Sequence, residues 1–248
     1  MNKLISVIIP YYKKKKYIST TINSAISQSY KNIEIIIVYD DENYDDLKLL
    51  EEIKKKDERI RIIKNKKKMG AGLSRNIGIS SSTGNYIAFL DADDTWEADK
   101  LSMQMNFMTD NNYIASHTSY QIVDEDRNVI GNRAARSFFH IEDLLKSCDI
   151  GTSTVIIKKN IFSDRIKFPS IKTKEDFVLW LRILERDIKI YGLDKNLSKW
   201  TKSNSSLSSS TIQKLKDGFK VYNKYMNFNL LKSLYYLICL SLNFIIKR

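Results

Sequence analysis

Three carboxylates, Asp91, Asp93 and Asp94, stand directly after the apolar run 86–90. A short run of aromatic and aliphatic residues is typical of a buried strand. Like charges at the end of a core strand repel one another unless something positive lies beside them. Because ligands of open α/β sheets bind at the carboxyl ends of strands, the cluster indicates a site for Mg²⁺ or Mn²⁺ shared with a phosphate. A solvated acidic turn is the alternative interpretation.

Two further acidic pairs could take part in the same chemistry. Asp40 and Asp41 follow a second apolar run and so stand at the end of another expected strand. Glu175 and Asp176 open an amphipathic stretch, and acidic side chains in the first turn of a helix are also stabilised by the macrodipole. The residues alone therefore allow two interpretations of the later pair, a catalytic base or a stabilised helix start.

An alternation of apolar runs and amphipathic stretches positions these acids. Apolar runs bounded by turn residues predict strands, and apolar residues at helical spacing predict helices. The expected strands are 4–9, 33–38, 59–63, 85–90, 152–157 and 188–193, with a hairpin at 114–123 and 128–131. The expected helices are 17–29, 45–56, 70–82, 97–109, 141–147, 174–186 and 229–248. Strands that alternate with helices indicate a doubly wound, mostly parallel α/β sheet.

Composition places the chain among globular proteins. Its 248 residues suffice for one substantial core, and 43% hydrophobic with 28% charged residues exclude a disordered chain. Two cysteines provide no disulfide framework, and two distant histidines provide no histidine-built zinc site. The apolar run at the start is too short for a secretory signal, so we expect a cytoplasmic protein.

The net charge of +12 comes mainly from lysines, with runs at 13–16, 54–56 and 66–68. Such runs are most often solvated surface, and a lysine-rich coding bias would also produce them. The functional alternatives are an anionic membrane surface, a pyrophosphate-bearing substrate and nucleic acid. We do not expect nucleic acid as a partner, because the runs have no interleaved aromatic residues.

The last stretch, 229–248, is apolar but interrupted by Lys232 and Asn243, and it is at the short end of what spans a bilayer. On a helical wheel its polar residues share one side and most apolar residues the other, which is typical of a helix lying in a membrane interface. Packing on the domain or on a second subunit is the alternative. The serine-rich stretch 203–210 is the expected boundary before it.

Five short blocks follow one another along the chain: 6–10 (SVIIP), 38–41 (VYDD), 72–78 (GLSRNIG), 84–94 (GNYIAFLDADD) and 175–180 (EDFVLW). Taken in this order, they resemble the family 2 inverting glycosyltransferases of the GT-A fold, a large group that builds bacterial surface polysaccharides. The resemblance covers residues 4–200. Each block alone is weak, and the order of all five carries the identification.

The resemblance implies a donor site, a metal site and a base. The implied contacts of a UDP-sugar are Pro10, Tyr12, Asp40, Asp41, Arg75 and Asp91. Asp93 is the implied direct ligand of Mn²⁺ or Mg²⁺, supported by Asp91. Asp176 is the implied base that takes the proton of the acceptor hydroxyl, with Glu175 as its helper. Trp180 would pack beneath the acceptor sugar or fill the core.

Some positions depart from the family pattern. Residues 42–44 (ENY) stand where Gly-Ser-Thr is usual, which puts the donor contacts of that loop in doubt. Lys13 replaces a frequent asparagine. No histidine follows Trp200, so a phosphate contact from that loop would have to come from Lys202. The alternative for Arg75 is an arginine exposed on its helix.

The expected reaction is transfer of galactose or glucose from a UDP-sugar, with inversion to a β-linkage, to GlcNAc or GalNAc on undecaprenyl diphosphate in O-antigen or capsule assembly. It would take place at the anionic cytoplasmic face of the inner membrane. We expect a GT-A catalytic domain at 1–203, with a nucleotide-sugar-binding half (1–110) and an acceptor-binding half (111–203), and C-terminal helices at 204–248. A nucleotidyltransferase, a non-catalytic relative and a basic binding protein are the alternatives.

Overall fold

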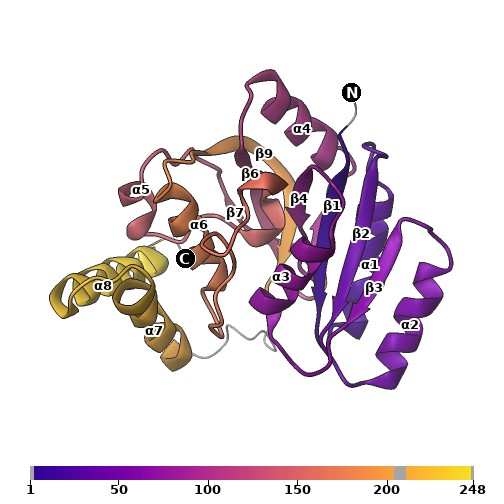
Figure 1. Cartoon of the computed structure of the whole chain (residues 1–248), viewed down its shortest axis with the longest axis horizontal. Coiled ribbons are helices and arrows are strands. Elements are labelled where there is room, and N and C mark those ends of the chain that lie inside the picture. The colour runs from indigo at the N-terminus through magenta and orange to yellow at the C-terminus, as the bar shows by residue number, and fades with distance from the viewer. Residues whose placement is uncertain (1–2, 204–210, 247–248) are drawn as a thin grey trace.

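Within the described residues, 3–203 and 211–246, a computed structural model shows a sheet of nine strands at the centre of the molecule (Figure 1). The strand order is β3-β2-β1-β4-β8-β6-β9-β5, and β7 pairs with β6. The strands are β1 (Ile5–Tyr11), β2 (Ile33–Tyr39), β3 (Ile60–Lys64), β4 (Tyr86–Phe89), β5 (Thr95–Trp96), β6 (Ala115–Val123), β7 (Val129–Arg133), β8 (Ile156–Lys158) and β9 (Ile190–Thr201).

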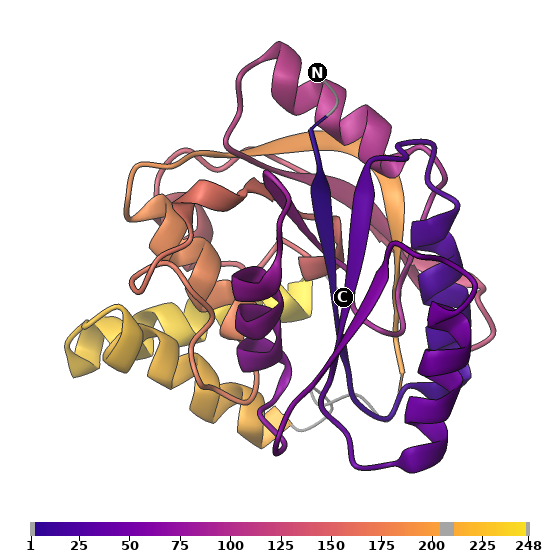
Figure 2. The same cartoon turned by 45° about the vertical axis from the view of Figure 1, so that its right-hand side comes forward.

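Helices cover both faces of the half of the sheet that holds β1 to β4. Two of them, α1 (Lys15–Ile26) and α2 (Tyr44–Lys54), lie on one face, and α3 (Ala71–Ser81) lies on the other (Figure 2). The remaining helices are α4 (Lys100–Asp110), α5 (Glu142–Leu145), α6 (Glu175–Leu184), α7 (Thr211–Lys220) and α8 (Leu230–Ile246). Short helical turns are η1 (Thr152–Thr154), η2 (Lys159–Ile161) and the π-helical η3 (Val221–Tyr225).

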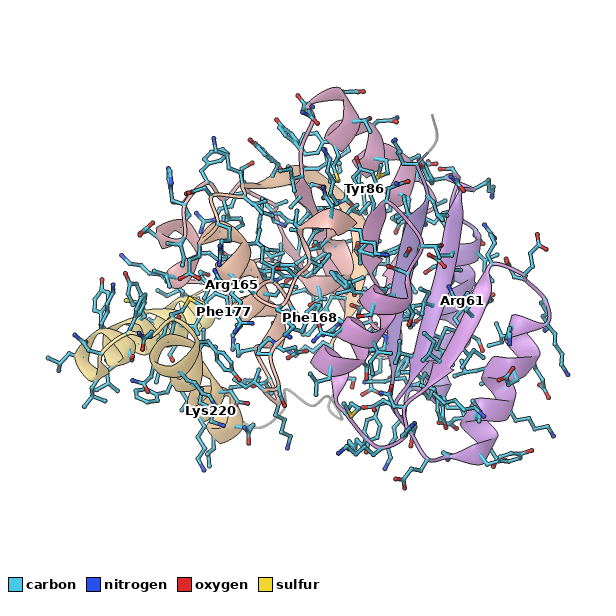
Figure 3. All side chains as sticks on the ribbon, in the orientation of Figure 1. Arg61, Tyr86, Arg165, Phe168, Phe177 and Lys220 are labelled. Atoms are coloured by element: carbon cyan, nitrogen blue, oxygen red, sulfur yellow. The ribbon has the colours of Figure 1, made fainter. Side chains whose placement is uncertain are left out.

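Alternate side chains of β1 enter two separate hydrophobic cores. Val7 and Ile9 pack in one core with Ile18 of α1, whereas Ile8 belongs to the other core, with residues of α3 and α6. Phe168 lies in this second core, between α3 and α6 (Figure 3). Because both faces of the strand are buried, its sequence is apolar almost throughout rather than alternating.

The sheet is mixed rather than mostly parallel, which corrects the expectation. Strands β1 to β4 pair in parallel, as expected from their helical connections. Beyond β4 the pairing changes: β8 is antiparallel to both β4 and β6, while β6 and β9 are parallel. A hairpin joins β6 to β7, and the short turn η1 leads into β8. Short connections of this kind produce antiparallel neighbours, whereas parallel neighbours need a long crossover.

Pro10 lies inside β1, although a proline was expected to end the strand. The carbonyl oxygen of Ile8 accepts from Leu90 on the β4 side, and that of Tyr11 accepts from Asp40 on the β2 side. The nitrogen of Pro10 therefore faces the β4 side, where pairing ends at Ile8. A residue without an N–H is tolerated there because the ladder between β1 and β4 has already ended.

Three elements differ from the expectation. The strand β9 runs to Thr201 instead of ending near residue 193, β5 had no predicted counterpart, and α7 falls in 204–248, where helices were expected but this one was not delimited. The second half of β9 is rich in lysine, asparagine and serine, and its pairing with β6 shifts register twice. A strand of this kind has little apolar periodicity to reveal it. Except for Ser203, the expected boundary 203–210 lies outside the described residues.

The side of α8 that faces the protein carries both polar and apolar residues: Ser233 and Leu240 are buried there, and Tyr236 and Leu237 pack against the second core. Ser233 is fully buried and donates to the carbonyl of Asn229, and the amide of Asn243 donates to the carbonyl of Lys146. The opposite side exposes a row of apolar residues: Leu231, Leu234, Tyr235, Ile238, Leu242 and Ile246. Across the described part of the chain, each helix is too short or too polar to cross a bilayer.

Candidate active site

The carboxyl ends of β1, β2 and β4 lie at one edge of the sheet, because the three strands are parallel neighbours. The loops that follow them carry Tyr12, Asp41 and Asp93. The helix α6 brings Glu175 and Asp176 to the same edge, although it follows far later in the sequence. This edge is therefore the candidate active site.

The loop after β4 is held by contacts to distant elements. Asp94 is buried, and its carboxylate accepts from the Ser153 hydroxyl at 2.5 Å and from the backbone N–H of Thr201 at 2.9 Å. Burial raises the pKa of Asp94 well above its ordinary value, and the neighbouring carboxylates add to the shift. Because this side chain fixes the loop to η1 and β9, the loop presents Asp91 and Asp93 in a defined geometry.

Asp91 and Asp93 are the partly exposed members of the cluster. The carboxylate of Asp91 accepts from the Arg75 guanidinium at 2.6 Å, and the carboxylate of Asp93 lies 2.6 Å from the Lys14 ammonium. Burial raises the pKa of Asp93, while Lys14 opposes that rise. The repulsion expected from three adjacent carboxylates is thus offset by two cations.

Arg75 joins the two acidic sites. It is 3% exposed, and its second amino group donates to Glu175 at 2.8 Å. Burial by itself lowers the pKa of this guanidinium, but Asp91 and Glu175 outweigh it and hold the pKa above its ordinary value. A buried, doubly paired arginine acts on its neighbours by fixing their positions, so the predicted nucleotide contact of Arg75 remains a prediction.

The N-terminus of α6 presents Asp176 beside Glu175. The carboxylate of Asp176 accepts from the Thr152 hydroxyl at 3.0 Å and from the backbone N–H of Phe177 at 2.7 Å. Burial raises the pKa of Glu175, and Arg75 counteracts the shift. A Cβ atom on Gly72 would lie 3.0 Å from Cγ of Glu175 and 3.2 Å from the carbonyl oxygen of Pro169, so any other residue at this point of α3 would require these neighbours to shift by a few tenths of an ångström.

The predicted pair Asp40 and Asp41 divides into two different environments. Asp40 is buried and accepts from the side chain of Asn65 and from the backbone N–H groups of Met69 and Gly70, each at 2.7 Å. Its contacts hold the loop before α3, where Gly70 takes a φ of +86° that disfavours other residues. The hydrogen-bonding capacity of the Asp40 carboxylate is therefore used within the protein, to hold this loop in place.

Asp41 is the more accessible of the pair. Its carboxylate accepts from the backbone N–H groups of Lys13 and Glu42, at 2.9 and 2.8 Å. Tyr12 lies in the adjacent loop with the Lys68 ammonium 3.8 Å from its ring centre, and Lys68 lowers the pKa of the phenol. Pro10 is partly exposed where β1 ends. This side of the site has the polar and aromatic groups that a nucleotide needs.

Trp180 fills the core, which is the second of the two roles expected for it from the sequence. The indole is fully buried and packs with Phe89 and Phe168, whose ring centres each lie 6.4 Å away. It has no exposed surface on which a sugar could stack, so its assignment to the acceptor site is replaced by a packing role. Although Trp180 lies one turn after Asp176, its side chain is on the side of α6 that faces the core.

Four side chains at the site were not singled out from the sequence. Thr152 and Ser153 contact Asp176 and Asp94, Lys14 contacts Asp93, and Arg127 donates to the carbonyl of Asp93 at 3.4 Å. Lys14 was hidden within a run of four lysines that looks like solvated surface. The positive φ of Arg127, in the turn between β6 and β7, is visible only in the structure.

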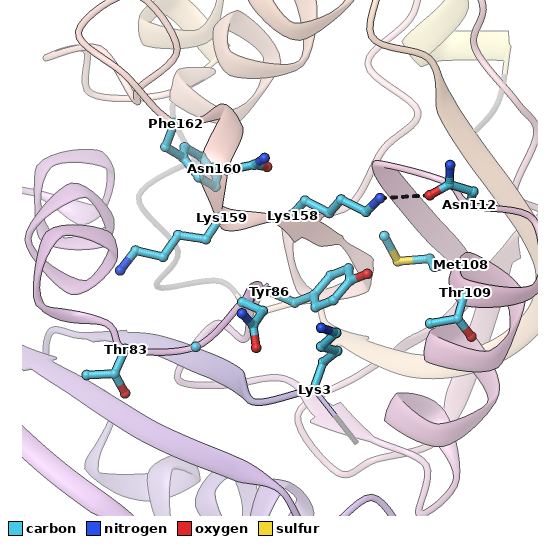
Figure 4. A pocket seen from close by; sticks show the side chains of 12 residues that line it. Lys3, Thr83, Tyr86, Met108, Thr109, Asn112, Lys158, Lys159, Asn160 and Phe162 are labelled. Carbon is cyan, nitrogen blue, oxygen red and sulfur yellow. Dashed lines mark hydrogen bonds between the residues drawn. The ribbon is translucent and has the colours of Figure 1, made fainter. Parts of the chain in front are cut away.

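A cavity of about 820 Å³ lies away from these acids, at the amino ends of β1 and β4 (Figure 4). Its walls include Lys3, Tyr86 and Lys158, and the ammonium of Lys158 donates to Asn112 at 3.1 Å. No carboxylate is among its lining residues. It therefore offers no metal ligand or carboxylate base, and the chemistry is assigned to the acidic edge despite this cavity's size.

The acidic edge suits a cation that is only partly bound by protein. Among the described residues, no three His, Cys, Asp or Glu side chains gather into a closed metal site. Mg²⁺ and similar hard ions are commonly held by one or two carboxylates and completed by phosphate oxygens and water. Asp93 and Asp91 provide such an open donor set, so these residues fit a divalent cation that arrives with a phosphate.

Three comparisons place this geometry among known proteins. The model of "Glycosyl transferase family 2" matches residues 6–165. UDP-Glc:alpha-D-GlcNAc-diphosphoundecaprenol beta-1,3-glucosyltransferase WfgD of Escherichia coli is 34% identical over 236 residues, which are 95% of this chain and 91% of that protein.

Solved structures share the fold at low sequence identity. S. aureus TarS in complex with UDP-GlcNAc has a TM-score of 0.75 and 20% identity over 94% of this chain and 70% of that chain. The mannosyltransferase PcManGT of Pyrobaculum calidifontis, in complex with GDP-Man and Mn²⁺, has a TM-score of 0.71 and 13% identity over 96% of this chain and 70% of that chain. The fold is thus that of the GT-A glycosyltransferases, and the chain belongs to glycosyl transferase family 2.

Proposed function

We propose that the chain transfers glucose or galactose from a UDP-sugar to a GlcNAc or GalNAc residue on undecaprenyl diphosphate, with inversion to a β-linkage. The product would serve O-antigen or capsule assembly. The observation that carries the proposal is the Arg75 guanidinium, which holds Asp91 of the donor side and Glu175 of the acceptor side in one site. The 34% identity to WfgD, whose name states a UDP-glucose donor and a GlcNAc-diphosphoundecaprenol acceptor, supports the substrate class.

The donor would occupy the edge formed by the loops after β1, β2 and β4. Asp41 is the accessible carboxylate there, and Tyr12 and Pro10 lie beside it. Asp40 acts indirectly, by holding the loop that leads into α3. The ribose of UDP has two hydroxyl donors and the uracil has one N–H, and a carboxylate such as Asp41 can accept two hydrogen bonds.

Asp93, supported by Asp91, would hold the divalent cation, Mn²⁺ or Mg²⁺. When bound, such a cation supplies positive charge that offsets the charge developing on the departing diphosphate. Arg75 keeps Asp91 oriented toward the same place. The Mn²⁺ in the PcManGT complex supports this part of the proposal.

Asp176 is proposed as the base. The acceptor hydroxyl attacks the anomeric carbon on the face opposite the diphosphate, its proton passes to the Asp176 carboxylate, and the bond from the anomeric carbon to the diphosphate oxygen breaks. The hydroxyl of Thr152 and the N–H of Phe177 orient that carboxylate. The Glu175 carboxylate is held by the Arg75 guanidinium, whereas the partners of Asp176 are the neutral donors of Thr152 and Phe177, which favours Asp176 as the base.

The outer face of α8 is proposed to rest on the anionic cytoplasmic surface of the inner membrane. The apolar row from Leu231 to Ile246 is exposed over the length of the helix, and Ile212 and Leu215 of α7 are exposed as well. Lysines flank these helices at 216, 220, 224 and 232. Apolar side chains bordered by lysines are typical of interfacial helices, and a lipid-linked acceptor would be delivered at such a surface. In this view 204–248 is an appendage to the catalytic domain 1–203, with its halves 1–110 and 111–203.

A donor screen tests the reaction. Purified full-length protein is incubated with UDP-glucose, UDP-galactose and other UDP-sugars and with a synthetic GlcNAc- or GalNAc-diphosphate-lipid, with and without EDTA. We expect UDP release and a β-linked disaccharide lipid with one hexose donor, and loss of turnover in EDTA. Release of pyrophosphate would instead indicate a nucleotidyltransferase, and no turnover with any donor would contradict the proposal.

A further inference from the structure

The Lys14 ammonium is paired with the carboxylate of Asp93, the residue proposed to hold the divalent cation. Its distance to the Asp93 carboxylate is 2.6 Å, and the two side chains are 19% and 15% exposed. The carbonyl of Lys14 accepts from the N–H groups of Tyr17 and Ile18, so the start of α1 fixes the backbone from which this side chain reaches. The pair is thus part of the folded architecture rather than a chance encounter of two flexible surface groups.

The other lysines of the same run have different neighbours. Lys15 lies 3.6 Å from Asp46 and Lys16 lies 3.2 Å from Glu125, both with more than half of the lysine side chain exposed. Lys13 lies over the ring of Tyr12. Lys14 therefore differs from the other three lysines in its partner, a difference that the run of four identical residues does not reveal.

Together, Lys14 and Arg75 neutralise the two partly exposed carboxylates of the acidic cluster. Arg75 pairs with Asp91, and Lys14 pairs with Asp93. A divalent cation on Asp93 would stand within a few ångströms of the ammonium, and two cations at that separation repel one another strongly in a partly buried site. Cation binding at Asp93 therefore requires Lys14 to move.

We propose that Lys14 is the resident counter-ion of Asp93 in the donor-free enzyme and that it moves to the donor diphosphate when the divalent cation arrives. This inference rests on the proposed function, because it assumes that a cation and a UDP-sugar meet at Asp93. A lysine side chain can make the change, since its ammonium is a point charge on a flexible four-carbon stem. Phosphate oxygens then replace the carboxylate as its partner.

Such an exchange couples the two ligands. Without a nucleotide, the cation must displace Lys14 and leave the ammonium without a partner, so the cation binds weakly. With a nucleotide present, the displaced ammonium gains a diphosphate, and the two ligands strengthen each other's binding by the same factor. The enzyme would thereby avoid holding a metal when no donor is present.

Two binding measurements test the exchange without relying on turnover. Mn²⁺ binding to the full-length protein is measured by electron paramagnetic resonance in the absence of nucleotide, and UDP binding is measured by calorimetry at saturating Mn²⁺. We expect Lys14→Met to bind Mn²⁺ about tenfold more tightly and UDP about tenfold more weakly than the wild type. Lys14→Arg keeps a cation at Asp93 and should keep weak Mn²⁺ binding. Lys15→Met, the adjacent control, should change neither affinity.

The opposite signs separate this role from structural damage, which would weaken both ligands. Equal Mn²⁺ affinity in Lys14→Met and wild type, with normal binding in the presence of UDP, would overturn the exchange and leave the proposed function intact. Absence of Mn²⁺ binding to every variant, even with UDP, would overturn both the exchange and the metal part of the proposed function.

Discussion

Asp91 and Glu175 accept hydrogen bonds from the two ends of one guanidinium, that of Arg75, at 2.6 and 2.8 Å. One carboxylate follows a strand of the parallel half of the sheet, and the other opens α6, which comes far later in the sequence. Had the two acidic sites lain on opposite faces of the molecule, they could not have served one reaction. A single buried arginine instead sets their separation, so the stability of the fold and the geometry of the site depend on the same side chain.

Replacing Arg75 should therefore destabilise the protein as well as inactivate it. Arg75→Met leaves Asp91 and Glu175 without a cation, and breaking a buried ion pair from one side costs about 3–5 kcal/mol. Arg75→Lys should recover part of that loss, since one ammonium cannot span both carboxylates as the fork does. Urea unfolding measures the free energy, and Arg165→Met, at an exposed arginine, is the control. A loss below about 1 kcal/mol for Arg75→Met would contradict the bracing role.

His117 should make the free energy of unfolding depend on pH. The ring is buried, its Nε2 contacts the Arg136 carbonyl at 2.7 Å, and burial lowers its pKa from 6.5 to about 4. The unfolded chain then binds more protons than the native chain below pH 6.5, so stability falls as pH falls toward 4. From pH 6.5 to 5 this residue should contribute a loss of roughly 1–2 kcal/mol.

The variant that tests this is His117→Gln, compared by urea unfolding at several pH values. Its stability should vary less between pH 6.5 and 5 than that of the wild type. His140→Gln changes the only other histidine of the chain, which is exposed, and should retain the wild-type slope. If both variants keep that slope, the acid loss comes from other groups.

The sequence predicted where the strands end, but not which of the acidic residues after each strand remains accessible to a ligand. Apolar runs predicted β1 to β4 closely, because buried parallel strands carry a strong compositional signal. Asp40 and Asp41 looked equivalent, yet backbone N–H groups from the loop before α3 occupy Asp40 alone. Those donors come from a loop whose path depends on tertiary packing, so spacing could not reveal them.

The sequence also did not show which side of each helix faces the protein. Trp180 was placed one turn from Asp176 correctly, but only the packing of Phe89 and Phe168 shows that it points into the core. Similarly, the wheel of α8 separated polar from apolar residues without showing that Ser233 and Asn243 would face the protein. A helical pattern defines two sides, and the partner that covers one of them comes from the fold.

The exposed row of α8 should govern membrane binding. Changing Leu234 and Ile238 together to serine removes two apolar side chains, each worth about 1.5 kcal/mol or more on full burial, so binding to anionic vesicles should weaken at least tenfold. Vesicle flotation of the full chain measures it. The matched control changes Val129 and Ile130 of β7, which are similarly exposed, and should float as the wild type does.

Two outcomes would contradict that role of α8. Equal flotation of the α8 variant and the wild type would remove the helix from the membrane contact. A fall in particle mass on sedimentation, with flotation unchanged, would show that the row covers a second copy of the chain instead.

Asp176→Asn should stop the chemical step while leaving donor binding intact. The amide keeps the shape of the side chain and can still meet Thr152, but it cannot take a proton from the acceptor hydroxyl. Loss of a general base lowers turnover by about 10²–10⁴-fold. Turnover is followed by UDP release, and UDP binding by calorimetry should match the wild type. Asp164→Asn, at a fully exposed carboxylate, should keep normal turnover. Near-normal turnover of Asp176→Asn would assign the base to another group, because a neutral amide cannot replace a carboxylate in that step.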